Sequence, residues 1–291
     1  ADGVARGEAL FGAGVLALQQ ADYAAARDHL AARLPLARDA GDAGATAATL
    51  TQLGHIAYRQ GRYAPAREVY EESLALWRGL GDCRGTALAL NGLGNVALAQ
   101  GECTEAAARY AESLALFRRR GDWDQVGITL CWLGRTRAEA GNAAAARACY
   151  VESLALYERV DKQHGRALPL LQLGDLAHQQ GDDREALAHY RASLARYRAA
   201  GSTVRIARCL EGIAGALAVT ARPEAAARLF GSAGVLRAGI GAPLLPIERL
   251  VYERDLAAAR AALGEAAFVA AQAAGAALPL DRALDEALRP D

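Results

Sequence analysis

The stretch TAATLTQLGHIAYRQGRYAPAREVYEESLALWRGLGD, residues 46–82, decides the fold, because its pattern returns further along the chain. A glycine, a tyrosine and a Ser-Leu pair recur every 40 residues, beginning at Gly61, Tyr70 and Ser73. A Leu-Gly pair recurs at the same interval, at Leu53-Gly54, Leu93-Gly94, Leu133-Gly134 and Leu173-Gly174. A fixed period of this length is typical of repeat architectures. The chain is therefore predicted to be an array of similar units.

Each unit is predicted to form two helices joined by a short turn. Apolar and small residues recur at helical spacing in both halves of the quoted stretch, and Gly61 separates them where a helix C-cap takes a left-handed residue. Pro65 falls in the first turn of the second helix, where its missing N–H is harmless. Gly81 ends that helix, and Asp82 is placed to cap the next one. One pair alone would leave an apolar face in water, so we expect stability to come from stacking.

These residues resemble the tetratricopeptide repeat. Counted from the Leu-Gly pair, that family's pattern expects a large residue four positions before the Gly, Ala twelve after it and an aromatic residue four later. Five units match, at Leu50, Leu90, Leu130, Leu170 and Leu210, then Ala66, Ala106, Ala146, Ala186 and Ala226, then Tyr70, Tyr110, Tyr150, Tyr190 and Phe230. The usual unit has about 34 residues, so this period resembles the longer-helix variant of kinesin light chains and bacterial signalling regulators. The resemblance implies an all-α solenoid of about six helix pairs.

The array is predicted to cover residues 1–241, followed by a helical cap at 242–291. In the first unit Pro35 is expected to interrupt the second helix, and in the fifth Pro169 predicts that residues 161–168 are kinked or loosely helical. Residues Ala242 to Pro246 are predicted to be an extended link, because the period stops at Gly241. The predicted units lie near 4–40, 44–80, 84–120, 124–160, 164–200 and 204–241, and the predicted cap helices at 247–263, 265–274 and 280–288.

The tail from Ala225 onward resembles the segment that closes the repeat array in bacterial STAND regulators, which are signal transduction ATPases with numerous domains. That resemblance implies a sensor array in signal transduction and transcription regulation, in which a separate ATPase core acts as the switch. The sequence contains no GxxxxGK[ST] phosphate loop and no methionine. We therefore expect a domain of a longer protein, or a processed product, with the ATPase and effector domains outside this segment.

Composition argues against several other classes of protein. The 33 basic and 33 acidic residues cancel, so the overall charge does not favour nucleic acid. No run approaches the roughly 20 apolar residues of a membrane span, and no signal peptide is visible. A cytoplasmic location is therefore expected, without contact to membrane. Five cysteines without a CxxC pair indicate idle thiols.

No motif for catalysis or for a cofactor is found, so the chain is not expected to be an enzyme. HExxH, GxSxG and a Cys/His couple are all absent. His55, Cys131 and His178 belong to different units, and packed helices about 10 Å apart keep such positions from converging on a metal. The glycines at 92–94 and 212–215 fall at helix-packing positions. They are expected to admit neighbouring helices and not phosphate.

The resemblance places a ligand-binding surface on the concave face, which the first helix of each unit lines in this family. Groove positions lie three before the Gly, one after it and four after it. In this sequence the groove positions correspond to Thr51, His55, Tyr58, Asn91, Asn95, Leu98, Cys131, Arg135, Ala138, Leu171, Asp175 and His178, with Arg208 and Glu211 at the far end. Trp132 lies beside them in the sequence. The position after the Gly reads His, Asn, Arg and Asp in successive units. Such variation is expected of a ligand-reading surface, although a solvated face would also vary.

Trp132 is the best single anchor on this face, because Trp and Arg dominate binding hot spots. The alternative is that it fills space beside small residues. The favoured hypothesis is a non-enzymatic sensor array that binds a protein or peptide, or a small-molecule effector, and relays this to an ATPase. The second hypothesis is a free-standing peptide-binding or scaffold adaptor. An enzyme is the third, and nothing in the sequence supports it.

Overall fold

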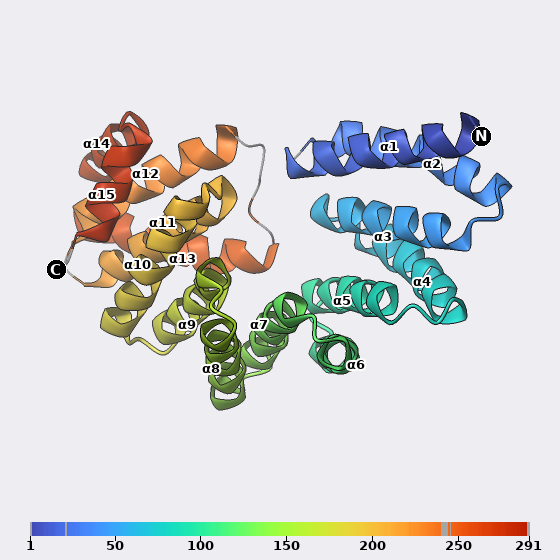
Figure 1. Cartoon of the computed structure of the whole chain (residues 1–291). Coiled ribbons are helices and arrows are strands. Elements are labelled where there is room, and N and C mark those ends of the chain that lie inside the picture. Colours follow the sequence, from blue (N-terminus) through green and yellow to red (C-terminus); the bar gives the residue numbers. More distant parts are fainter. Residues whose placement is uncertain (1, 21, 221, 240–243, 245, 290–291) are drawn as a thin grey trace. The chain divides into compact units, whose positions relative to one another are not determined.

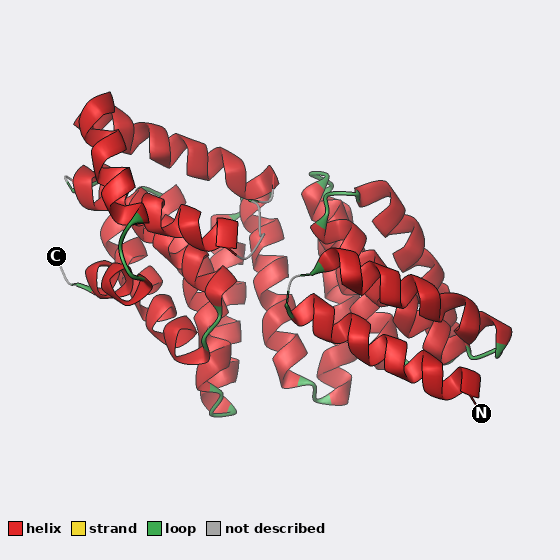
Figure 2. Cartoon of the chain, turned by 90° about the horizontal axis from the view of Figure 1, so that it is seen from above, coloured by secondary structure: helices red, strands yellow, loops and turns green. Residues whose placement is uncertain are grey.

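The computed structural model of the chain describes residues 2–20, 22–220, 222–239, 244 and 246–289. Over these residues the chain is helical and contains no strand, as Figure 2 shows. The helices form two compact units, residues 1–142 and 143–291, which are described one at a time below (Figure 1). The predicted all-α solenoid of helix pairs is confirmed.

The first compact unit contains α1 to α7. Each helix from α1 to α6 packs against the next one, and the first helices of neighbouring repeats also touch: α1 contacts α3, α3 contacts α5, and α5 contacts α7. These first helices therefore form one layer, and we call the side of it that faces away from the second helices the first-helix face. The bounds are α1 Asp2–Gln19, α2 Tyr23–Asp39, α3 Ala43–Arg59, α4 Tyr63–Gly79, α5 Cys83–Ala99, α6 Cys103–Arg120 and α7 Trp123–Glu139.

The second compact unit contains α8 to α15 and a 3-10 turn, η1. Here α9 and α11 are first helices that touch each other, and α10 and α12 are second helices. Its core gathers residues from α9 to α15, with Tyr190, Phe230 and Phe268 among the largest buried side chains. The bounds are α8 Ala143–Arg159, η1 Gln163–Arg166, α9 Ala167–Gln179, α10 Asp183–Ala200, α11 Thr203–Val219, α12 Pro223–Gly239, α13 Pro246–Leu263, α14 Glu265–Ala276 and α15 Leu280–Leu288.

The turns between helices follow the predicted chemistry. Gly61 and Gly81 have φ of +72° and +68°, the left-handed conformation that glycine adopts without strain. The Asp82 carboxylate accepts a hydrogen bond from the Gly85 N–H at 2.7 Å and so caps α5. At the equivalent turn after α8, Asp161 adopts φ of +51° where the other turns have glycine. The predicted turn and cap positions are therefore confirmed.

The repeated glycines make room for the repeated tyrosine. Tyr190 is 1 % exposed and lies between Gly174 on its own repeat and Gly212 on the next. A Cβ atom at either glycine would come within 2.6 Å of its ring. Tyr70 is held in the same way, with Gly92 the tighter neighbour. These glycines lie inside helices and serve packing, as the sequence predicted.

Proline has different effects in the two helices where it was expected to cause disruption. The prediction that Pro35 interrupts its helix is wrong, because α2 continues to Asp39. Pro35 removes one hydrogen bond to the carbonyl four residues earlier, and Ala31 there is exposed, so water can satisfy that carbonyl. In the fifth repeat the prediction is confirmed. A 3-10 turn covers Gln163–Arg166, and α9 begins only at Ala167, two residues before Pro169.

The last three helices attach in two different ways. α14 packs along α12 and takes the place that the first helix of a further repeat would occupy, and α15 touches α10, α11 and α12. α13 lies against α11 as well as α12 and meets the first-helix face of the second unit. The predicted link at Ala242 to Pro246 falls largely outside the described residues, and α13 begins at Pro246. The division into an array to residue 241 and a cap beyond it stays a prediction.

Candidate ligand-binding face

In the first unit, some of the predicted groove side chains are open to solvent and others are packed against protein. His55 is exposed, and Tyr58, Asn95, Trp132 and Arg135 are partly exposed. At these five positions, and at Ala138, the first-helix face of this unit is open to solvent.

Three further predicted positions in this unit, Thr51, Asn91 and Cys131, are turned toward protein, and Leu98 is buried as well. The Thr51 hydroxyl lies 2.7 Å from the Ser73 hydroxyl and accepts a hydrogen bond from the Trp77 indole at 3.3 Å, so it faces α4. Asn91 is 8 % exposed, and its amide donates to the Thr129 hydroxyl at 2.9 Å. Cys131 is buried. Their side chains therefore serve the packing of the array.

The position directly after the repeat Gly has a structural role in two repeats. Asn95 accepts a hydrogen bond from the Tyr110 hydroxyl at 2.7 Å, and Asp175 accepts one from Tyr190 at 2.9 Å. A buried tyrosine needs such a partner for its hydroxyl. Variation at this position therefore reflects in part which residue accepts the hydrogen bond from the tyrosine hydroxyl of each repeat. The sequence contained this signal, because each tyrosine follows the polar residue by a constant 15 positions.

Trp132 and Arg135 form a pair on α7. The Arg135 guanidinium lies 6.0 Å from the centre of the Trp132 ring, at the limit for a cation–π contact. Trp132 occupies the position at which Gly92 and Gly212 admit a tyrosine in other repeats. Both side chains are partly exposed, so this pair offers an apolar surface beside a positive charge.

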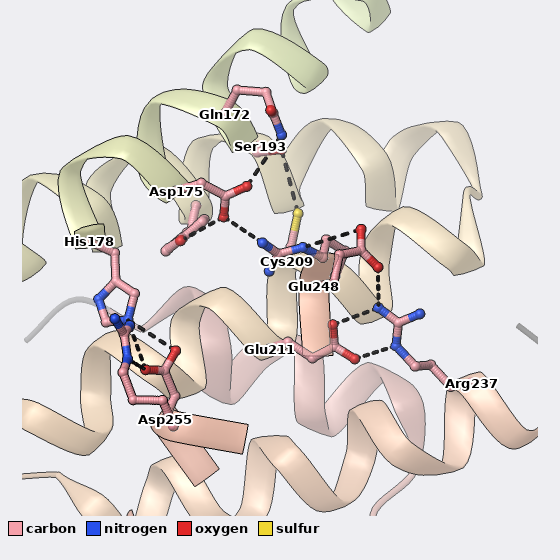
Figure 3. Close-up of polar contacts among 12 residues, drawn as sticks. Gln172, Asp175, His178, Ser193, Cys209, Glu211, Arg237, Glu248 and Asp255 are labelled. Carbon is pink, nitrogen blue, oxygen red and sulfur yellow. Dashed lines mark hydrogen bonds and ion pairs between the residues drawn. The ribbon is translucent and has the colours of Figure 1, made fainter. Parts of the chain in front are cut away.

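In the second unit, Asp175 of α9 makes polar contacts with both α10 and α11. Its carboxylate accepts hydrogen bonds from the Gln172 amide at 3.2 Å and from the Arg208 guanidinium at 2.8 Å, in addition to that of Tyr190 (Figure 3). Burial lowers the pKa of Arg208, but the charges of Asp175 and Glu248 outweigh it and raise the pKa above the ordinary value. Arg208 therefore stays charged although little of it is exposed.

Glu248 of α13 extends this chain of charges across the face. Its carboxylate lies 4.0 Å from the Nε atom of Arg208 and 3.9 Å from the Nη2 atom of Arg237 on α12. Arg237 in turn donates to both oxygens of Glu211, at 2.7 Å for the Nη2 contact. Positive and negative groups thus alternate from Asp175 to Glu211, over α9, α11, α13 and α12 (Figure 3).

Asp255 of α13 makes the second contact to the face, at His178. The His178 Nε2 atom lies 3.1 Å from the Asp255 carboxylate, and Nδ1 contacts Asp183 of α10. Burial lowers the pKa of His178, but the two carboxylates outweigh it and raise the pKa above the ordinary 6.5. Arg254 also pairs with Asp255, at 2.7 Å, and its Nη2 atom lies 3.0 Å from the imidazole. The bare backbone of Gly215 leaves room for this carboxylate, since a Cβ there would lie 2.5 Å from it.

The structure thus brings together Asp175, His178, Arg208 and Glu211, but with a helix of the same chain on top of them. Their partners were not among the positions predicted from the sequence; these are Asp183, Arg237, Glu248 and Asp255. One signal was available, because Glu248 and Asp255 are seven residues apart and share one helix face. Assigning this helix to a cap hid its contact with the first-helix face.

The described residues form no metal-binding cluster, and three of the five cysteines are buried. In this described part of the chain, no three His, Cys, Asp or Glu side chains are grouped to hold a metal ion. All five cysteines are free, and burial raises the pKa of the Cys209 thiol to about 12. Among the same described residues, no helix is both long enough and apolar enough to cross a membrane.

Comparison with known proteins agrees with the repeat geometry. The tetratricopeptide repeat profile matches residues 45–119 and 125–199, which together make up just over half of the chain. The chain belongs to the tetratricopeptide repeat family. No curated protein sequence matches it.

Several solved structures resemble this chain in fold. A Rap protein complexed with competence and sporulation factor is 12% identical, with a TM-score of 0.70 over 98% of this chain and 75% of that one. A STAND protein with a tetratricopeptide repeat sensor from Pyrococcus horikoshii is 14% identical, with a TM-score of 0.64 over 96% of this chain. This chain spans 43% of that protein. BtubC from P. vanneervenii is 18% identical, with a TM-score of 0.56 over 79% of this chain and 93% of its own.

Proposed function

We propose that this tetratricopeptide array is a non-enzymatic module that binds a protein or peptide, as the sensor of a cytoplasmic bacterial signalling or transcriptional regulator. The proposal rests on α13, which lies against the first-helix face of the second unit and is bound there by Arg208, Arg237 and His178. This face therefore has the chemistry to recognise a helical segment. The first unit presents the same kind of face with Trp132 and Arg135 partly exposed.

Two solved structures support this role by analogy of fold. The Rap protein was solved with competence and sporulation factor, and in the STAND protein the tetratricopeptide repeats are described as a sensor. By the same analogy, an ATPase and an effector domain would belong to the full-length regulator and receive the signal. A small-molecule effector is the other class of ligand for the same face.

A free-standing adaptor is the second candidate function. It is favoured by BtubC, because this chain spans 93% of that protein and both are similar in fold. The two candidates share the binding face and differ only in the domains to which the array is joined.

The test of binding begins by immobilising the array and identifying by mass spectrometry what it retains from a lysate. The purified partner is then titrated against the wild type and against Arg135→Ala and Trp132→Ala. Each substitution is expected to weaken binding by about 2 kcal/mol, or roughly 30-fold, because central Trp and Arg residues dominate interfaces. Arg62→Ala is the matched control, since Arg62 is exposed at the start of α4. If binding survives both substitutions but is lost on changing Arg119 of α6, the second helices read the partner and the assignment is wrong.

A further inference from the structure

α13 is attached to the array through apolar residues that mostly stay partly exposed. Only Asp255 and Ala259 are buried among its residues with described side chains, and Leu250 is 76 % exposed. The core of the second unit is also contacted by four partly buried residues of this helix, Tyr252, Leu256, Ala258 and Leu263. The Tyr252 ring lies edge-on to Phe230, with ring centres 5.3 Å apart. Burial of apolar surface is the main force that holds helices together, and α13 buries most of its contacting apolar side chains incompletely.

α14, the next helix, is attached more closely. Phe268 is fully buried, and Gly275 brings the α14 backbone directly against Arg228 of α12. The Ser232 hydroxyl adds a hydrogen bond to the Gly275 carbonyl at 2.8 Å. α14 therefore has close contacts to α12 that do not involve α13, in addition to the Arg260 guanidinium of α13, which lies 4.8 Å from the centre of the Phe268 ring. The two helices are joined through Gly264, whose φ of +77° is a conformation that favours glycine.

The polar contacts of α13 come from carboxylates at two points of its length. Glu248 and Asp255 are seven residues apart, which corresponds to about 10.5 Å along a helix. They meet Arg208 and Arg237 at one point and His178 at the other. Buried ion pairs of this kind contribute little net stability, because desolvation offsets most of the attraction. A segment with the same two carboxylates would satisfy the same cations at a similar cost.

We propose that α13 is a displaceable internal occupant of the face formed by α9 and α11, and that the partner displacing it is an acidic helical peptide segment. That segment carries two carboxylates seven residues apart, which take the positions of Glu248 and Asp255. The inference rests on the proposed function and names the partner class for the second unit. The strap formed by α13 lifts while α14 and α15 stay docked.

The test uses a labelled peptide with the sequence of α13, residues 246–263, and the full chain. Fluorescence anisotropy measures its binding to the wild type and to the Glu248→Gln/Asp255→Asn protein. In that protein the internal helix competes poorly, so the peptide is expected to bind at least 10-fold more tightly than to the wild type. Glu253→Gln, on the exposed side of the same helix, is the matched control and should bind as the wild type does. A peptide carrying Glu248→Gln and Asp255→Asn should bind at least 10-fold more weakly than the unmodified peptide.

Hydrogen exchange on the wild-type protein gives a second measurement that needs no substitution. Amides of α13 should exchange at least 10-fold faster than those of α14, because the strap opens locally. The proposal is overturned if the two helices are equally protected, or if the double-variant protein binds the two peptides equally well or not at all. If, in that case, the partner isolated from the lysate still loses affinity on substitution of Arg135 or Trp132, the proposed binding function holds and only the proposal about α13 is wrong. If the partner does not depend on them either, the proposed function fails as well.

Discussion

Gly275→Ala tests the close contact that holds α14 on α12. A Cβ atom at Gly275 would lie 1.9 Å from the Arg228 carbonyl oxygen and 2.5 Å from its Cα atom. The helix-to-helix contact of a carbon with a carbonyl oxygen is normally about 3.3 Å or longer. The new atom is therefore about 1.4 Å too close. Its neighbour is backbone and cannot turn aside, so α14 has to move.

The size of the effect follows from two opposing contributions. Overpacking of a close contact costs about 1–3 kcal/mol, and the upper end applies here because displacement also loosens Phe268 and the Ser232 hydrogen bond. Alanine in place of glycine inside a helix returns about 1 kcal/mol through helix propensity. The second compact unit should therefore lose about 2 kcal/mol of unfolding free energy. That loss lowers its urea midpoint by roughly 1 M for an ordinary m-value.

Two spectroscopic probes separate the compact units in a urea titration. All three tryptophans, Trp77, Trp123 and Trp132, belong to residues 1–142, so their fluorescence follows the first unit. Far-UV circular dichroism follows both units. The dichroism transition should shift while the fluorescence transition stays in place. Gly234→Ala on α12 is the matched control, because a Cβ there meets nothing within 4 Å and should stabilise the helix by about 1 kcal/mol.

A Gly275→Ala protein as stable as the Gly234→Ala control would refute the close contact of α12 and α14. It would also remove the argument that α14 stays docked when α13 lifts. Gly231→Ala probes the same contact from the other helix, since its Cβ would lie 2.1 Å from the Gln272 carbonyl oxygen. Because one displacement of α14 relieves both clashes, the double variant should cost less than the sum of the single ones.

Three further outcomes are expected. The pKa of His178 is raised in the folded protein, so the contribution of His178 to the unfolding free energy is complete below pH 6.5 and is lost as pH rises through the folded-state pKa. The melting temperature of the second unit should therefore fall over this range in the wild type but not in the His178→Gln protein. A 1–241 fragment exposes Leu229 and Phe230 and should self-associate, whereas a monodisperse, equally stable fragment would show that α13 to α15 are not a cap. Tyr190→Phe removes one buried hydrogen bond and should destabilise by about 1 kcal/mol in a denaturant titration; no loss would deny that bond a role.

The helices could be predicted because the signals that set them are local. The turn glycines and the capping aspartates each act within a few residues of the chain, and the 40-residue period repeats them from unit to unit. Pro35 was misjudged for a reason outside its own helix, since the carbonyl left without a partner belongs to an exposed residue. Whether a proline ends a helix depends on what surrounds that carbonyl. Sequence spacing alone does not show this.

The candidate site was harder to predict because its contacts join residues far apart in sequence. His178 and Asp255 are separated by 77 positions, and no periodic pattern relates them. Asp175 and Arg208 lie at expected groove positions, but the groove there is covered by α13. The family pattern describes the face of each repeat. It does not show where a helix beyond the last repeat will dock.

The contrast between α13 and α14 explains how one end of an array can be both firm and adaptable. Backbone contacts at Gly231 and Gly275 leave no room for a Cβ atom and hold α14 against α12. Ion pairs at Glu248 and Asp255 set the register of α13, while contributing little net stability. A helix with a larger and fully buried apolar face would leave more apolar surface in water when it is displaced, and that exposure would oppose displacement more strongly. A helix bound through carboxylates leaves side chains that water solvates readily. The polar character of this contact therefore favours exchange of α13 for a partner over permanent closure.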